Sequence, residues 1–474
     1  MNKKYKYLGK NTIIFAISSF GTKILSFLFV PLYTAILSTS EYGTADLITT
    51  TATLLVYILT INISASVLRF TLEQYNNRNN ILAYGIKIIF IGTFICGIIL
   101  SILYSFNFMN WPIQNYVCII LYFFASAMYE TMTNYLRAID KVKEVAIAGV
   151  ISSLVIIVCN IVLLLLLKVG FIGYLISIIL GPLISAIFCI ISVKEPVKMY
   201  IVSKCSVTLK KEMIRYCIPL IFNNMALWIN AFLDRYFVTY YCGVSDNGVY
   251  SVAGKIPTIL STCYSVFSSA WALSAIIEYD PKDKDGFFSN TYNTYGALMT
   301  MLCSVIILFN IPLAKFLYSK DFFVAWKYSS ILLLSVMFNT LTVFQGSIFS
   351  AAKKTRSVAT TTIISAMVNT VFDIILIPNI GVIGAAIATA VAYLVMWATR
   401  YIYLKKYICM KINIIKDILV YLILVVQICF EHFDNHFYIG QLMCLILIVY
   451  LNKKYLKTII KIFARKFKND EVSI

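Results

Sequence analysis

Residues 227–238 read Leu-Trp-Ile-Asn-Ala-Phe-Leu-Asp-Arg-Tyr-Phe-Val and place Asp234 and Arg235 side by side in an otherwise apolar helical stretch. The whole chain of 474 residues is 60% hydrophobic and 13% charged, with a mean hydropathy of +0.84. Soluble domains carry about 25% charged residues. Apolar runs of about 20 residues, long enough to cross a bilayer as a helix, recur along this chain. The sequence therefore predicts an all-α multi-pass membrane protein.

The apolar runs predict fourteen membrane-spanning helices, of which the last is the shortest: 11–37, 44–68, 81–104, 112–134, 145–167, 171–193, 214–240, 247–275, 290–315, 328–350, 357–378, 382–404, 414–430 and 437–451. The net charge of +19 is concentrated in the loops on the side of the N-terminus. Lysine and arginine gather in this way in cytoplasmic loops, so we expect both termini in the cytoplasm. This distribution also speaks against binding of nucleic acid.

The chain repeats itself with an offset of about 205–213 residues. The Gly-x-x-Gly of Gly170 and Gly173 recurs at Gly381 and Gly384. A repeat of six helices predicts two lobes of the same orientation around a central cavity. We draw the lobes at 1–193 and 214–404. The basic loop 194–213 joins them, and 405–474 adds two helices and a basic tail.

Several cations lie within the predicted spans. Lys87 is close enough to the cytoplasmic end to reach the headgroups, and three others are candidates for facing the cavity: Lys23, Arg235 and Lys255. A charged side chain at the centre of a bilayer costs about 2.5–3.5 kcal/mol unless it has a partner or a wet cavity. The spans contain too few acids to pair every cation, which predicts that the three bind an anion in the cavity. The alternative for each is that its charge reaches the headgroup region. Arg235 lies about 100° around the helix from Asp234, so one of the two must meet another helix or the cavity.

Other polar residues within spans are candidates for lining the cavity or for coupling transport to an ion: Asp234, Asn230, Asn160, Asn369 and Asp373. Asp373 has three open roles: neutralising a cation, carrying a proton, or bonding the backbone of a neighbouring helix. We predict no metal site and no cofactor. Asp283-Lys-Asp285 has a spacing that can hold a metal for a nucleotide sugar, but a solvated loop is the favoured interpretation. No catalytic constellation is evident, so we expect no enzyme.

Three segments resemble bacterial polysaccharide flippases. Residues 35–47, Ala-Ile-Leu-Ser-Thr-Ser-Glu-Tyr-Gly-Thr-Ala-Asp-Leu, look like their first external turn. Asp234-Arg235 followed by 248–256, Gly-Val-Tyr-Ser-Val-Ala-Gly-Lys-Ile, is similar to the start of their second lobe. Residues 378–389, Pro-Asn-Ile-Gly-Val-Ile-Gly-Ala-Ala-Ile-Ala-Thr, resemble their turn between the eleventh and twelfth helices. The family is the Wzx-like oligosaccharide flippases of the multidrug/oligosaccharidyl-lipid/polysaccharide (MOP) exporter superfamily.

This resemblance implies alternating access and export of an undecaprenyl-pyrophosphate-linked oligosaccharide to the outer leaflet of the bacterial plasma membrane, for O-antigen, capsule or exopolysaccharide synthesis. Expected partners are this substrate and membrane lipids, with a polysaccharide polymerase and a chain-length regulator as candidates. Coupling to a proton, sodium or anion gradient, or to the membrane potential, is an expectation without an assigned ion. The alternative is a drug/cation antiporter of the same superfamily, whose cavity should be rich in acids.

Overall fold

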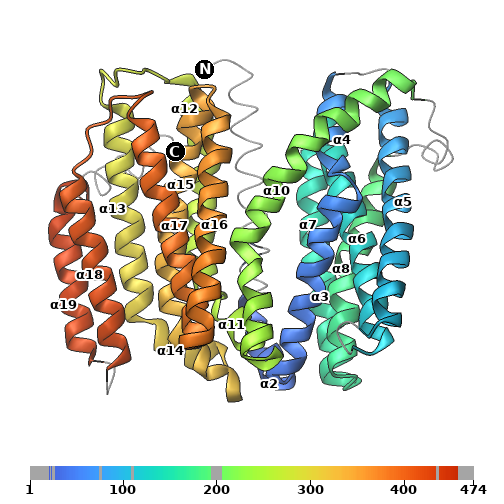
Figure 1. The fold of residues 1–474 in the computed structure, drawn as a ribbon, viewed down its shortest axis with the longest axis horizontal. Coiled ribbons are helices and arrows are strands. Elements are labelled where there is room, and N and C mark those ends of the chain that lie inside the picture. The colour runs from blue at the N-terminus through green and yellow to red at the C-terminus, as the bar shows by residue number, and fades with distance from the viewer. Residues whose placement is uncertain are drawn as a thin grey trace, which may run out of the picture. The chain divides into compact units, whose positions relative to one another are not determined.

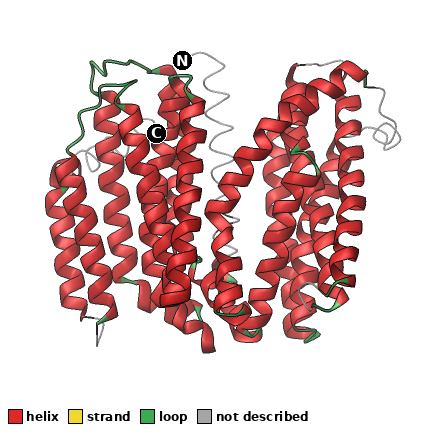
Figure 2. Cartoon of the chain, in the orientation of Figure 1, coloured by secondary structure: helices red, strands yellow, loops and turns green. Residues whose placement is uncertain are grey.

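The computed structural model describes residues 21, 23, 27–73, 77–107, 111–193, 205–433 and 437–456. Across these residues every regular element is a helix and no strand occurs (Figure 2). Two compact units divide the chain, Met1–Tyr236 and Phe237–Ile474. The all-helical fold predicted from the apolar runs is confirmed.

In the part of the chain that the structure describes, the first unit contains eight helical elements and most of a ninth. Figure 1 labels its helices. In chain order they are α2 (Val30–Ile36), α3 (Thr39–Leu59), α4 (Ile63–Glu73), α5 (Arg78–Ser105), α6 (Ile113–Ala138), α7 (Val142–Asn160), the π-helix η2 (Ile161–Leu166), α8 (Phe171–Val193) and α10 (Val207–Tyr241). α6 packs against α3, α4, α5 and α8, so its face carries much of the buried core, including Phe123, Met132 and Tyr135.

The second span of this unit begins with a cap and breaks near its middle. The Ser38 hydroxyl accepts a hydrogen bond from the backbone N–H of Glu41, and the Glu41 carboxylate accepts one from the backbone N–H of Ser38. This capping box satisfies two amides that have no partner inside the helix. The break between α3 and α4 holds Ile61 and Asn62 at φ of 54° and 52°. Left-handed backbone is uncommon for a β-branched residue, so packing must maintain the break.

The long helix α10 packs along the first unit up to the unit boundary. The indole N–H of Trp228 donates to the carbonyl of Thr50 over 3.2 Å. The hydroxyls of Tyr236 and Thr51 lie 2.7 Å apart. The boundary between the compact units therefore falls inside α10, after Tyr236. The lobes drawn from the sequence repeat, 1–193 and 214–404, stay a prediction.

The second unit holds the remaining helices among the described residues. They are α11 (Val244–Ala253), α12 (Pro257–Ile277), α13 (Phe287–Leu308), α14 (Asn310–Leu317), the 3-10 helix η3 (Lys320–Ala325), α15 (Trp326–Ala351), α16 (Thr355–Ile380), α17 (Val382–Leu404), α18 (Ile414–His432) and α19 (Tyr438–Leu451). α15 packs against α12, α13 and α17 and is the most buried long helix of this unit. The hairpin of α18 and α19 lies along α13 (Figure 1).

Ten helices of the described chain are long and apolar enough to cross a membrane, or eleven if the bent pair Pro257–Ser265 and Ala270–Ile277 forms one span. α19 is a shorter apolar helix of 14 residues. The predicted first span, 11–37, lies mostly outside the described residues. The expected count of fourteen is thus roughly matched.

Candidate functional site

Arg235 forms an ion pair inside the first unit. Its Nη1 lies 2.5 Å from Oδ1 of Asp46 on α3, and the two side chains are 19% and 14% exposed. The guanidinium also lies over the ring of Phe232, 4.8 Å from its centroid. One of the two adjacent charges thus meets another helix, as the sequence predicts, because Arg235 pairs with Asp46 on α3. The premise that nearby acids are too few is wrong for Arg235, because Asp46 stands at the same depth on a helix 189 positions away.

Asp234 and Asn230 are buried next to this ion pair. Oδ1 of Asp234 accepts a hydrogen bond of 2.9 Å from the backbone N–H of Arg235. Nδ2 of Asn230 donates to the carbonyl of Ala226 over 3.1 Å. Both side chains therefore bond backbone of their own helix, and both are under 5% exposed. Their predicted role in coupling stays a prediction.

Asn160 is fully buried and joins three helices. Its Oδ1 accepts a hydrogen bond of 2.6 Å from the hydroxyl of Ser177 on α8, and its Nδ2 donates to the hydroxyl of Tyr33 on α2 over 3.3 Å. The Tyr33 ring packs edge-on against Tyr174, with centroids 5.1 Å apart. Asn160 marks the point where the α-helix α7 passes into the π-helix η2, a change that often accompanies functional sites.

The two lysines differ in setting. Lys23 is exposed, and most of its neighbours along the chain lie outside the described residues. Lys255 is half-buried in the turn between α11 and α12. Among the residues that the structure describes, no carboxylate forms an ion pair with either ammonium group. Both therefore remain available as cations for an anionic ligand.

α16 carries a buried polar face in the second unit. Thr362, Ser365, Asn369 and Asp373 are all under 3% exposed, and their spacing of three or four residues puts them on one side of the helix. Ser365 donates to the carbonyl of Ala392 on α17 over 2.9 Å. Neither side-chain atom of Asn369 has a hydrogen-bond partner within the described chain. A buried amide without partners is costly, which is typical of sites that take up water or an ion.

Sequence reasoning missed Arg400, which falls in the predicted span 382–404 but received no role. Arg400 lies inside α17 with only 5% of its surface exposed. It donates to the hydroxyls of Thr361 and Thr362 on α16 over 3.1 and 3.0 Å, and to the carbonyl of Thr342 on α15 over 2.6 Å. A guanidinium with several fixed donors can join three helices in this way. The two threonines, 38 and 39 positions before Arg400, were the only signal in the sequence.

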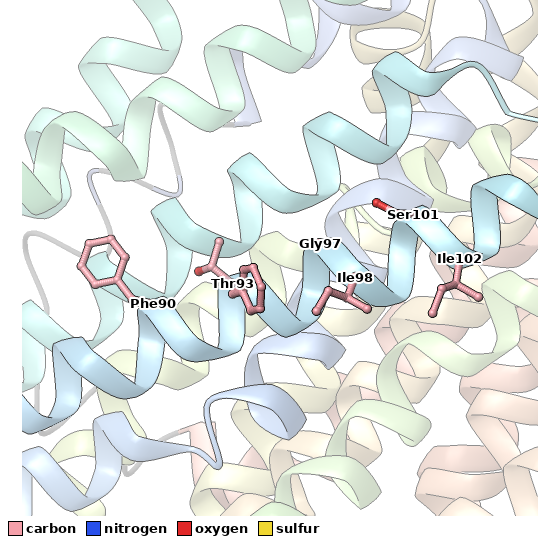
Figure 3. Close-up of a pocket in the computed structure, with 7 residues that line it drawn as sticks. Phe90, Thr93, Gly97, Ile98, Ser101 and Ile102 are labelled. Atoms are coloured by element: carbon pink, nitrogen blue, oxygen red, sulfur yellow. The ribbon is translucent and has the colours of Figure 1, made fainter.

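A groove of about 660 Å³ runs along the outward face of α5 (Figure 3). Its lining residues are Phe90, Thr93, Phe94, Gly97, Ile98, Ser101 and Ile102. The groove is apolar apart from two hydroxyls and contains no charged group. It therefore offers nothing that would bind a pyrophosphate.

The fold resembles that of membrane transporters. The lipid II flippase MurJ in an inward closed conformation matches 97% of this chain and all of its own, with a TM-score of 0.66 and 18% identity. An inward-facing multidrug resistance MATE transporter of the MOP superfamily matches 83% of this chain and 98% of its own, with a TM-score of 0.66 and 13% identity. A MOP superfamily transporter from Pyrococcus furiosus matches 86% of this chain and 99% of its own, with a TM-score of 0.60 and 14% identity. These identities define the fold alone.

The fold is thus that of a multi-span helical transporter. The family model described as "Polysaccharide biosynthesis protein" matches residues 8–272, more than half of the chain, and the protein belongs to that family. No curated protein matches the sequence. The resemblance to MOP exporters that the sequence motifs suggested is confirmed.

Proposed function

We propose that the protein moves undecaprenyl-pyrophosphate-linked oligosaccharide units from the cytoplasmic to the outer leaflet of the bacterial plasma membrane, by alternating access. The observation that carries this proposal is a pair of matches. A polysaccharide biosynthesis family model covers most of the chain, and a lipid II flippase fold covers nearly all of it. The first points to glycan assembly, and the second to a lipid-linked cargo. O-antigen, capsule and exopolysaccharide units are the candidate cargoes.

A drug/cation antiporter is the second candidate, because a MATE transporter reaches the same TM-score of 0.66. Two observations favour the flippase. Two multidrug resistance MATE transporters leave 14% and 17% of this chain unmatched, whereas the lipid II flippase leaves 3%. Lys23 and Lys255 also lack acidic partners in the described chain, a setting that suits an anionic cargo better than a cation.

In this proposal the pyrophosphate binds Lys23, Lys255 and Arg235. Arg235 differs from the lysines because Asp46 already neutralises it. We therefore propose that phosphate oxygens replace Asp46 at Arg235 when substrate binds. The buried amides and acids Asn160, Asn369 and Asp373 are the proposed coupling residues for a proton, sodium or anion gradient. A polymerase and a chain-length regulator remain proposed partners.

The test is analysis of lipid-linked intermediates in a strain that lacks the gene and carries variants at equal protein level. Lys23→Glu should abolish export, and undecaprenyl-linked units should accumulate on the cytoplasmic face. Lys23→Arg should retain more export than Lys23→Gln, because the charge is kept. The matched control is Lys143→Glu, which reverses an exposed lysine at the start of α7. Full export by a Lys23→Ala, Lys255→Ala double variant would refute the assignment, and efflux of cationic drugs with normal glycan export would favour the antiporter.

A further inference from the structure

A second pocket, of about 450 Å³, opens at the start of α18. Lys411, Ile412, Asn413, Ile414, Ile415 and Tyr455 line it. It lies at the end of the second unit where the segments that follow α12, α15 and α17 meet. The Cys409 N–H donates to the carbonyl of Pro281 over 2.9 Å. The Lys354 ammonium lies 5.6 Å from the ring centroid of Tyr407. The predicted topology makes this the cytoplasmic end. The pocket is far in sequence from every residue assigned above to the pyrophosphate.

One wall of the pocket is cationic and rich in donors. Lys411 is exposed, and no carboxylate of the described chain forms an ion pair with it. The backbone N–H groups of Ile414 and Ile415, the first two residues of α18, precede the first hydrogen bonds of the helix. The Asn413 side chain caps the next amide, that of Lys416, over 3.2 Å. The Lys416 ammonium forms an ion pair with Asp417 at 3.2 Å and donates a hydrogen bond to Oδ1 of Asn452 over 3.1 Å. Of the two lysines, Lys411 is therefore the one available to bind an anion.

The other wall is apolar and continues along α18, within the predicted span 414–430. Ile415 is 72% exposed, and Leu419 and Leu422 are 47% and 56% exposed. Their spacing of four and three residues sets them in one row along α18. A ligand that fits both walls needs a negatively charged group at one end and a hydrocarbon chain at the other.

Lys411 belongs to a loop whose backbone is held from both sides. Its N–H donates to the Ser289 hydroxyl over 2.8 Å, and its carbonyl accepts from Nδ2 of Asn293 over 3.1 Å. The Ser289 hydroxyl in turn donates to the carboxylate of Asp283, which also accepts from the backbone N–H groups of Phe288 and Ser289 over 2.9 Å each. Asp283 is only 9% exposed. The interpretation of Asp283-Lys-Asp285 as a solvated loop is therefore wrong for Asp283, which caps α13 and supports the position of Lys411.

The surroundings of the pocket are strongly basic. Residues 405–417 and 452–456 contain six lysines and a single acid, Asp417, which is paired with Lys416. Lysines beside the cytoplasmic end of a membrane helix attract anionic lipids, by about 1 kcal/mol for each one near the surface. The local potential thus favours a negative headgroup.

We propose that this pocket binds an anionic phospholipid, with the phosphate held by Lys411 and the first amides of α18 and an acyl chain lying along Ile415, Leu419 and Leu422. General attraction of basic loops to membranes needs no pocket and no particular lysine. The proposed site is specific, because a fixed loop, an open surface pocket and an apolar row meet at one place. It is separate from the transport of the glycan cargo.

The test compares purified wild type with Lys411→Gln by native mass spectrometry, counting bound phosphatidylglycerol. Loss of Lys411 should weaken binding about fivefold, the ratio that corresponds to about 1 kcal/mol. Lys411→Arg should restore it. Lys406→Gln is the matched control, because Lys406 is an exposed lysine of the same loop outside the pocket.

Three further arms identify the ligand. Asn293→Leu removes the hydrogen bond to the Lys411 carbonyl and should also weaken phosphatidylglycerol binding. Phosphatidylcholine should bind more weakly than phosphatidylglycerol, and equal binding would overturn the proposal by showing that the apolar wall acts alone. Inorganic phosphate should not displace the lipid at similar concentration. Displacement would overturn the lipid assignment, as would equal losses in Lys411→Gln and Lys406→Gln.

Discussion

The ion pair of Asp46 and Arg235 should show a large coupling free energy in a double-mutant cycle. The single changes Asp46→Asn and Arg235→Gln each leave one charge without its partner. Breaking a fully buried pair costs about 3–5 kcal/mol, and breaking an exposed pair costs under about 1 kcal/mol. The side chains here are 14% and 19% exposed, so the cost lies between these limits. We expect each single variant to lower the free energy of unfolding by about 2 kcal/mol.

The double variant should lower the free energy of unfolding by about as much as one single variant does, because it leaves no lone charge. The coupling free energy is then about 2 kcal/mol. The assay is unfolding by sodium dodecyl sulfate from mild detergent micelles, followed by circular dichroism. The matched control is the pair Arg69 and Glu73, which lies on one helix at a distance of 3.0 Å with both side chains about half exposed. Its cycle should show coupling too small to measure.

A coupling below about 0.5 kcal/mol for Asp46 and Arg235 would refute the reasoning, because independent sites add within that margin. Export is a separate readout at equal protein level. Arg235→Lys should keep part of it, since a lysine retains the charge but loses the planar geometry of the guanidinium. If Arg235→Ala exports normally, Arg235 has no role in the transport cycle.

Three other outcomes follow from particular contacts. Gly384→Ala should destabilise the second unit by about 1–3 kcal/mol, because a Cβ there would lie 2.7 Å from the backbone of α16. The control is Gly97→Ala, whose Cβ meets nothing within 4 Å and which should melt in detergent at the same temperature as wild type. Gln427→Leu removes two hydrogen bonds to Ser304, of 2.7 and 3.0 Å, and should cost about 1–3 kcal/mol; equal thermal stability would show that the hairpin docks by apolar contact alone. Ser206→Cys in a cysteine-free background should react with an impermeant reagent only after the cells are opened, and labelling of intact cells would reverse the topology.

The sequence by itself determined the class of fold, because helix formation and membrane insertion depend on local patterns. An apolar run of about 20 residues satisfies its own backbone hydrogen bonds wherever it is placed in a bilayer. The polar face of α16, from Thr362 to Asp373, is also readable from spacing alone and is buried as a row. The family followed from short motifs such as residues 35–47.

Only the tertiary structure decided which polar groups meet. Spacing along a helix gives the depth and the face of a side chain but not the neighbour on the next helix. Arg235 therefore looked unpaired until Asp46, 189 positions earlier, was found beside it. Arg400 lies in the predicted span 382–404, but its partners on α15 and α16 could not be read from the sequence. Asp283 looked solvated until the loop that carries Lys411 covered it. In each case the partner comes from a separate segment, and packing alone brings the two together.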